Sequence, residues 1–369
     1  MATLAELSAQ TPRLALVGLA KNTGKTVALT ALLSELAAAG ETVGVTSVGR
    51  DGESHDVIDF RIQKPLVTLR AGDLVATTDG LLRASGVPYE LLERTGIRTP
   101  LGEVLLARLN GPGTVEIAGP SAAADTREVA DRMLEHGARR VVIDGAIDRR
   151  AASSPEVSDG LVMSTGAILS EDMREVVERT AEAVALARVP GLGDSPEDAR
   201  VKELARTLEP GGGFLLDEGL NVFPLPAGRF VLTAEPAVIQ AFLRDGGTQP
   251  RWLLVSGALP ERFLDGLVGY ARRLGQPLKV LTSDPTRVFL AARGVEHYAR
   301  AGIELRVLRP IDLLAVTVNP VAPQSHSFDS AALRGELAAA IPDLPIFDVL
   351  HPSYAGAAAL MPRMRGASA

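Results

Sequence analysis

The chain has 369 residues, of which 46% are hydrophobic and 22% charged, a composition typical of globular rather than disordered proteins. Its 38 basic and 45 acidic residues give a net charge of −7, which argues against a nucleic-acid partner. The absence of cysteine excludes disulfides, cysteine-ligated zinc and a cysteine nucleophile. No apolar run reaches the length of a membrane span and no signal-peptide pattern opens the sequence, so we expect a cytoplasmic protein without a membrane partner.

The most informative stretch of the sequence runs from residue 13 to residue 40. The apolar run from Leu14 to Val17 predicts a buried strand that ends at Gly18, and the apolar spacing after position 26 predicts a helix that stops at Gly40. Gly24-Lys25-Thr26 stands where this helix begins. A strand, a Gly-containing loop, Gly-Lys-Thr and a helix in this order predict the phosphate-binding loop of nucleoside triphosphatases, although a strand–turn–helix corner is the plainer alternative.

The chemistry of such a loop accounts for these residue types. Backbone N–H groups at a helix N-terminus point at phosphate oxygens, and the helix dipole favours their negative charge. We expect Lys25 to reach the β- and γ-phosphates, as a catalytic residue, and Thr26 to bind Mg²⁺. The residues predicted to contact the nucleotide are Gly18, Lys21, Asn22, Thr23, Gly24, Lys25 and Thr26. Because the guanine signature Asn-Lys-x-Asp is absent, ATP is the expected nucleotide.

The spacing of the loop is unusual, since its first glycine is Gly18 and five residues rather than four separate it from Gly24. In this it resembles the loops of dethiobiotin synthetase and the cobyrinic acid diamide synthases. The additional lysine of the related MinD-type loops would fall at Ala20 here. Lys21 lies one place later, so we assign it phosphate contact and not a role across a dimer.

Carboxylates that follow later strands are the candidates for the metal side of the site. The apolar run 141–143 ends in Asp144, the pattern of a Walker B strand whose carboxylate holds Mg²⁺ through water. Asp51 follows the strand predicted for 43–48 and is a candidate for positioning the attacking water, with a solvated turn as the alternative. Other polar residues of this region stay open as site residues, metal ligands or parts of a loop: Glu53, His55, Asp56, Asp59 and Lys64.

Alternating strand and helix patterns predict an α/β protein with a mainly parallel P-loop NTPase sheet flanked by helices, followed by a second α/β domain. We expect the NTPase domain at 1–190, a Pro- and Gly-rich boundary at 191–215, and a C-terminal domain of unknown ligand at 216–369. Two further helices are expected at 81–95 and 102–109. Polar groups at predicted strand ends of the second half, such as Asn319-Pro320, describe a crevice for a small ligand or a protein, or are loops without a role.

Several motifs together resemble the smaller subunit of lysine 5,6-aminomutase reactivase. They lie at 17–26, 46–53, 118–121, 142–149, 164–167 and 316–320. The resemblance implies an ATPase that works with a larger ATPase subunit to release damaged cobalamin from an adenosylcobalamin-dependent aminomutase client. It also implies that the loops 50–56 and 145–153 respond to the γ-phosphate.

Two other functions stay open at this point. One is an ATP-dependent ligase or kinase of the dethiobiotin synthetase type, in which ATP activates a carboxylate bound beside the γ-phosphate. The other is a nucleotide-binding partner that hydrolyses little and signals by occupancy. Association into a homo-oligomer is also left open by the sequence.

Overall fold

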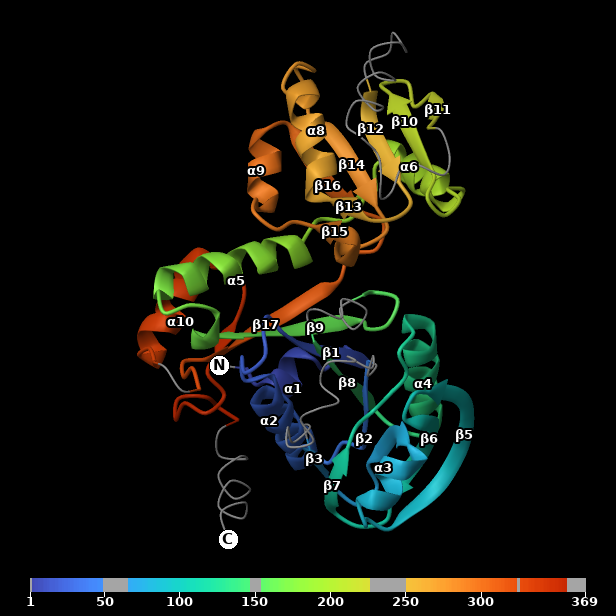
Figure 1. Ribbon diagram of the computed structural model, residues 1–369, viewed down its shortest axis with the longest axis vertical. Coiled ribbons are helices and arrows are strands. Elements are labelled where there is room, and N and C mark those ends of the chain that lie inside the picture. The colour runs from blue at the N-terminus through green and yellow to red at the C-terminus, as the bar shows by residue number, and fades with distance from the viewer. Residues whose placement is uncertain (1, 49–65, 147–153, 226–249, 324–325, 357–369) are drawn as a thin grey trace. The chain divides into compact units, whose positions relative to one another are not determined.

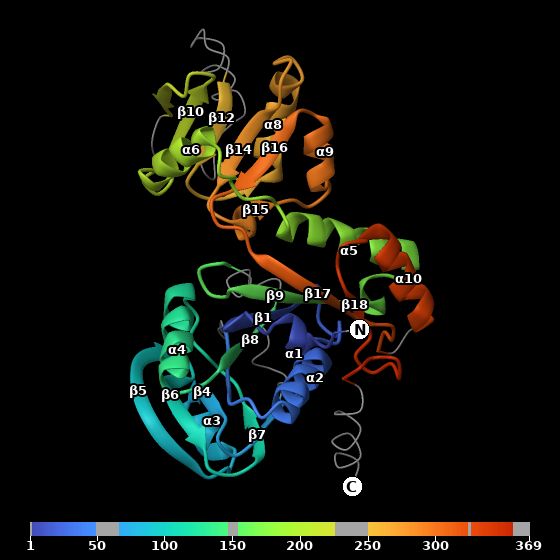
Figure 2. The ribbon, with the colours of Figure 1, turned by 180° about the vertical axis from the view of Figure 1, so that it is seen from behind.

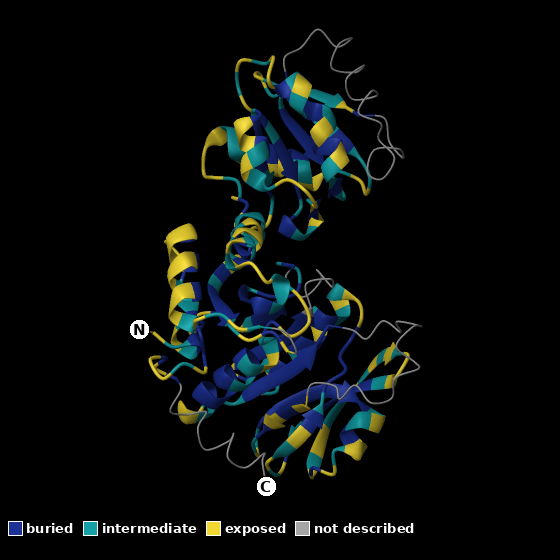
Figure 3. Ribbon diagram, turned by 60° about the vertical axis from the view of Figure 1, so that its left-hand side comes forward, coloured by how far each residue is buried: buried dark blue, intermediate teal, exposed yellow. Residues whose placement is uncertain are grey.

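The computed structural model describes residues 2–48, 66–146, 154–225, 250–323 and 326–356. The chain forms two units, the first made of Met1–Ala181 with Asp312–Ala369 and the second of Glu182–Ile311 (Figure 1). In each unit the strands carry most of the buried residues, whereas the helices expose one face (Figure 3). No helix within the described ranges has the length and apolar character needed to cross a membrane.

The first unit is built on a nine-stranded sheet. Its strands, in the order in which they lie side by side, are β18 (Ile346–Phe347), β17 (Asp312–Asn319), β9 (Gly160–Gly166), β1 (Arg13–Gly18), β8 (Arg140–Ala146), β2 (Val43–Ser47), β4 (Leu74–Thr78), β6 (Gly102–Leu109) and β5 (Tyr89–Thr99). Neighbouring strands from β18 to β4 are parallel, and β6 and β5 add an antiparallel edge. The unit is therefore mixed α/β with a mostly parallel sheet, as the sequence predicts.

Helices and a separate two-stranded sheet complete this unit. The helices are α1 (Leu4–Leu7), α2 (Lys25–Ala38), α3 (Asp79–Ala84), α4 (Ala123–Glu135), α5 (Met173–Ala187), which continues into the second unit, α10 (Ser330–Ala340) and the 3₁₀ turn η2 (Ala167–Leu169). A separate antiparallel pair consists of β3 (Leu66–Leu69) and β7 (Gly113–Glu116). The short helix α1 packs against α2, which views from opposite sides both show (Figure 1 and Figure 2).

The central strands form where the sequence has continuous apolar runs. All residues of β9 are buried, and β1 is buried from Leu14 to Gly18, because parallel strands are covered on both faces. The predicted strands at 14–17, 43–48 and 141–143 and the predicted helix before Gly40 are all confirmed.

Of the helix expected at 81–95 only the first turn, 81–84, is helical, and the helix expected at 102–109 is wrong. After the short α3, the chain forms the antiparallel pair β5–β6 instead. The run Val104–Ala107 is buried throughout, and such a short apolar run fits a buried strand as well as a helix. Gly96 and Gly102 both have positive φ, 75° and 122°, which suits a bulge and a tight turn and not the interior of a helix.

The C-terminal residues return to the first unit. β17 runs parallel to β9 along Asp312–Asn319, and β18 extends the same sheet. The structure thus divides the chain differently from the expected domains 1–190 and 216–369, because the second unit is inserted between α5 and β17. Pairing between strands so distant in the sequence leaves no local signal from which this insertion could be read.

The second unit has a five-stranded sheet of its own. In spatial order its strands are β11 (Val222–Pro224), β10 (Gly213–Asp217), β12 (Pro250–Val255), β14 (Leu278–Thr282) and β16 (Ile303–Val307). Strands β12, β14 and β16 are parallel to one another, and β10 is antiparallel to both of its neighbours, β11 and β12. Its other elements are α6 (Pro196–Arg206), α8 (Glu261–Ala271), α9 (Val295–Arg300), η3 (Pro285–Arg287), β13 (Leu259–Pro260) and β15 (Val288–Phe289). The expected boundary 191–215 therefore contains a helix, which begins with the cap Ser195 and with Pro196.

One carboxylate fastens α6 to this sheet. Glu197 Oε1 accepts hydrogen bonds from Arg251 Nε at 2.9 Å, from the indole of the buried Trp252 at 2.7 Å and from Lys279 Nζ at 3.1 Å. Burial alone would raise the pKa of Glu197, but the three donors outweigh it and lower the pKa to about 2. Glu197 is thus a negatively charged anchor of the second unit.

Candidate phosphate-binding site

A cavity of about 540 Å³ opens at the carboxyl end of β1, where the sequence predicts the phosphate loop. It is lined by Gly18, Leu19, Ala20, Lys21, Asn22, Thr23, Gly24, Lys25, Thr26, Val27, Asn319 and Pro323. We call it the loop cavity. Its size is that of a small-molecule or cofactor site, and it lies where open α/β sheets bind their ligands.

The two glycines of the motif are required by the shape of the loop. A Cβ atom on Gly18 would lie 2.5 Å from Thr23 Oγ1, and Thr23, with 1% of its surface exposed, donates its hydroxyl to Ala20 O at 3.0 Å. Gly24 has φ of 84°, and a Cβ on it would lie 3.0 Å from Asn319 Cβ. A side chain at either position would displace the loop. The fold therefore requires glycine at both ends of this five-residue spacing.

Neighbouring strand ends hold the loop from outside. Leu19 N donates to Ser164 O of β9 at 2.9 Å. Asn319, the last residue of β17, donates its amide to Asn22 O at 3.0 Å and accepts from Val321 N at 3.2 Å. Asn22 has φ of 65°, a conformation that asparagine tolerates better than most residues. The loop is therefore fixed by two strands as well as by its own sequence.

Helix α2 presents its N-terminus to the loop cavity. Its first residues, Lys25, Thr26 and Val27, line the cavity, and no side chain in the described part of the chain caps the helix at Gly24. The first amides of a helix have no partner within the helix and carry its positive dipole end. A helix start that combines these amides with a lysine suits an anion such as phosphate.

Lys25 faces a buried carboxylate. Its Nζ lies 2.7 Å from Asp144 Oδ1 on β8, with 20% of the lysine side chain and 10% of the aspartate side chain exposed. This Oδ1 accepts no hydrogen bond of ordinary geometry from the described residues. Its negative charge is balanced by the Lys25 ammonium. A buried carboxylate oxygen with spare acceptor capacity, close to the hydroxyl-bearing start of α2, fits a Mg²⁺ site held through water.

The loop that contains Gly119 reaches the same edge of the sheet as Asp144. Ser47, at the end of β2, pairs in register with Asp144 of β8. Gly119 N donates to Ser47 Oγ at 3.0 Å, and a Cβ on Gly119 would lie 2.1 Å from Ser47 O. The Gly-Pro-Ser corner of the sequence is thus packed against the strand end beside Asp144.

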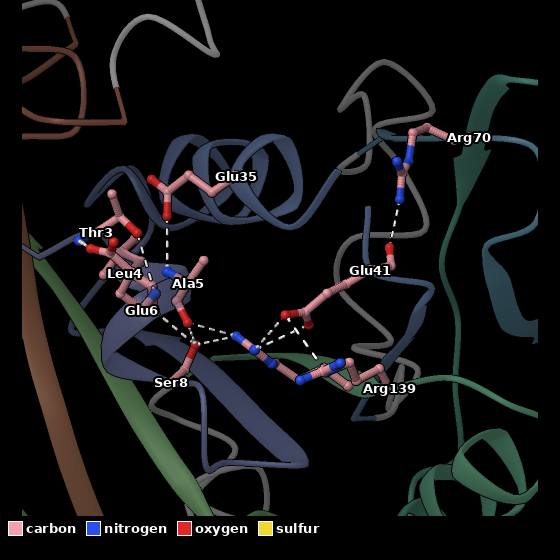
Figure 4. A network of polar contacts seen from close by, with 10 residues as sticks. Thr3, Leu4, Ala5, Glu6, Ser8, Glu35, Glu41, Arg70 and Arg139 are labelled. Atoms are coloured by element: carbon pink, nitrogen blue, oxygen red, sulfur yellow. Dashed lines mark hydrogen bonds and ion pairs between the residues drawn. The ribbon is translucent and has the colours of Figure 1, made fainter. Parts of the chain in front are cut away.

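The far end of α2 is anchored by a buried polar network (Figure 4). Glu35 Oε2 accepts from Ala5 N at 2.9 Å, and burial raises the pKa of Glu35. Arg140, at the start of β8, donates to Ser8 Oγ at 2.8 Å and lies 3.0 Å from Glu41 Oε2, while burial lowers the pKa of Arg140. These contacts join α1, α2 and β8 at the end of the sheet opposite Asp144.

The structure brings together the predicted loop residues Gly18, Lys21, Asn22, Thr23, Gly24, Lys25 and Thr26 around the loop cavity, with Asp144 beside Lys25. The candidates Asp51, Glu53, His55, Asp56, Asp59 and Lys64 lie outside the described residues, as does most of the loop 145–153. Sequence reasoning did not place Asn319 or Pro323 in this site, although the polar strand end Asn319-Pro320 was a signal.

No known protein-family model matches the chain, and no curated protein matches it in sequence.

Proposed function

We propose that the first unit is a P-loop nucleoside triphosphatase that binds ATP with Mg²⁺ in the loop cavity. The observation that supports this most directly is the uncapped start of α2 with Lys25 beside the buried Asp144. Lys25 and the loop amides bind the phosphates, and Thr26 and Asp144 hold the metal. When bound, Mg²⁺ neutralises charge on the phosphoryl group that is transferred.

Asn319 and Pro323 line the same cavity from the C-terminal part of the chain. Asn319 keeps the turn at Asn22 in place, so the amides that would contact phosphate are already oriented before the ligand arrives. Pre-organisation of this kind reduces the conformational entropy lost on binding.

We propose further that nucleotide binding serves a protein client, as in the reactivase that the sequence motifs resemble. This proposal depends on the motifs at 118–121 and 316–320, which the fold carries to the same edge of the sheet as the phosphate loop. The client would be an adenosylcobalamin-dependent aminomutase, on which this protein would act together with a larger ATPase subunit.

Calorimetric titration with Mg·ATP and Mg·GTP tests the binding step. Wild type should bind ATP, and Lys25→Ala should lose at least tenfold in affinity, whereas Lys202→Ala, which removes an exposed lysine of α6, should bind as wild type does. At a hundred times its dissociation constant ATP should stabilise the wild type by about 2.7 kcal/mol. Absence of binding by wild type, or equal binding by Lys25→Ala, would overturn the assignment.

Turnover assays then separate the uses of ATP. Hydrolysis that rises only with the aminomutase present supports a reactivase, and hydrolysis that rises only with a carboxylate metabolite supports a ligase of the dethiobiotin synthetase type. Binding with neither response would indicate a protein that signals by nucleotide occupancy.

A further inference from the structure

The Lys25–Asp144 ion pair joins the two groups that the proposed function assigns to different ligands. Lys25 is meant for phosphate and Asp144 for Mg²⁺, yet here the ammonium lies 2.7 Å from the carboxylate. Each charge thus neutralises the other at a site where both side chains are at least four-fifths buried. At such burial an ion pair is screened much less by solvent and salt than at the surface.

We propose that this ion pair is a latch, a contact that must break for either ligand to bind, and that it makes Mg²⁺ and nucleotide bind together. The inference rests on the proposed nucleotide site. A nucleotide without metal meets a lysine whose charge is already balanced, and a metal without nucleotide meets a carboxylate whose charge is already balanced. With both present, Asp144 would hold the metal ion and the Lys25 ammonium would contact the phosphates, so each group of the pair would gain a new partner of opposite charge.

The latch predicts opposite effects of the same substitution with and without metal. In EDTA, Asp144→Asn should bind ADP about 5- to 100-fold more tightly than wild type, the usual span of coupling between sites. With Mg²⁺ present, the order should reverse, because the variant has lost its metal-side carboxylate. Asp79→Asn removes a half-buried carboxylate of α3 in the same unit, one that pairs with Arg83, and should behave as wild type in both conditions.

A double-mutant cycle separates the latch from simple repulsion between Asp144 and phosphate. If Asp144→Asn acts by releasing Lys25, its gain in metal-free ADP affinity should shrink when Lys25 is replaced by Gln. If it acts only by removing repulsion, the gain should be equal or larger in the Lys25→Gln background, since no ammonium then shields the carboxylate. That second result would overturn the proposal.

A metal titration gives an independent answer that holds even where Asp144→Asn does not fold. Mn²⁺ binding to nucleotide-free protein, followed by electron paramagnetic resonance, should become at least several-fold tighter in Lys25→Gln than in wild type, because Asp144 is then unpaired. Unchanged or weaker Mn²⁺ binding would overturn the latch. If wild type binds no nucleotide even with Mg²⁺, the proposed function itself has failed, whereas ordinary Mg·ATP binding without these couplings refutes the latch alone.

Discussion

The glycine that opens the phosphate loop gives a direct test of the loop's geometry. In Gly18→Ala the new Cβ would lie 2.5 Å from Thr23 Oγ1 and 3.2 Å from Ala20 O. Neither neighbour can easily give way, because Thr23 is buried and its hydroxyl is bonded to that same Ala20 carbonyl. The loop must therefore shift as a whole, which moves the amides at the start of α2 away from their positions.

The size of the effect follows from the tightness of this contact. Overpacking of a closed site costs about 1–3 kcal/mol of folding free energy. A displacement near 1 Å at a pre-organised binding loop lowers affinity or activity by up to about a hundredfold. We expect a lower urea midpoint and a 10- to 100-fold loss in Mg·ATP affinity by calorimetry. Gly80→Ala is the matched control, since its Cβ would meet no atom within 4 Å and its helical position favours alanine.

Removal of the clashing hydroxyl should reverse part of the damage. In Gly18→Ala/Thr23→Ala the nearest contact of the new methyl is Ala20 O at 3.2 Å, which a small adjustment relieves. The double variant should bind ATP more tightly than Gly18→Ala does, although Thr23→Ala alone weakens the loop by loss of its hydrogen bond. Wild-type affinity in Gly18→Ala, or a double variant in which the two losses simply add, would refute the view that Gly18 is required for steric reasons.

Two further predictions concern the contacts that hold each unit. Asn319→Ala loses both side-chain hydrogen bonds and should cost about 1–2 kcal/mol of stability and several-fold ATP affinity. Asn221→Ala loses its side-chain hydrogen bond to Asp217 in the second unit and should not change ATP binding. Equal ATP affinities of wild type and Asn319→Ala would show that Asn319 does not hold the loop. Because the pKa of Glu197 falls from 4.5 to about 2 on folding, its stabilisation is present above pH 4.5 and is lost as the pH falls toward 2. Urea unfolding can be followed by the fluorescence of Trp252, the one tryptophan. The free energy of unfolding of wild type should fall by about 2 kcal/mol over this pH range, and that of Glu197→Gln should lack this fall. Parallel pH profiles of the two proteins would contradict the prediction.

The strand, loop and helix that form the proposed phosphate loop could be predicted from the sequence because they are contiguous. The apolar run of β1, the glycines and the start of α2 lie within some twenty residues, and each has a local physical cause. The position of Asp144 could be predicted for a similar reason, since it ends an apolar run and lies near the carboxyl end of β8, where open α/β sheets bind their ligands. The pairing of Asp144 with Lys25 could not be predicted from the sequence, because side-chain pairing between distant elements has no sequence period.

The hairpin β5–β6 shows the limit of periodicity. Val104–Ala107 is a four-residue apolar run, which is too short to reveal a period, and β5 mixes intermediate and exposed residues at the edge of the sheet. Gly96 and Gly102 were the available signals, since glycines at such spacing weaken a helix and permit a turn. Residue patterns identified the parallel centre of the sheet well and its antiparallel edge poorly.

The position of Asn319 follows from strand order and not from any motif. In a parallel sheet the residues at one edge are those that follow neighbouring strands, so the loop after β1 meets the ends of β8, β9 and β17, however far apart these are in the chain. A boundary near residue 190 would separate the phosphate loop from β17, which pairs with β9 along its length and ends at Asn319. Because the second unit is inserted before β17, the lining of the loop cavity is complete only after that unit has been synthesised. The C-terminal segment is therefore part of the proposed catalytic unit, and the second unit is connected through β17 to a residue that touches the phosphate loop.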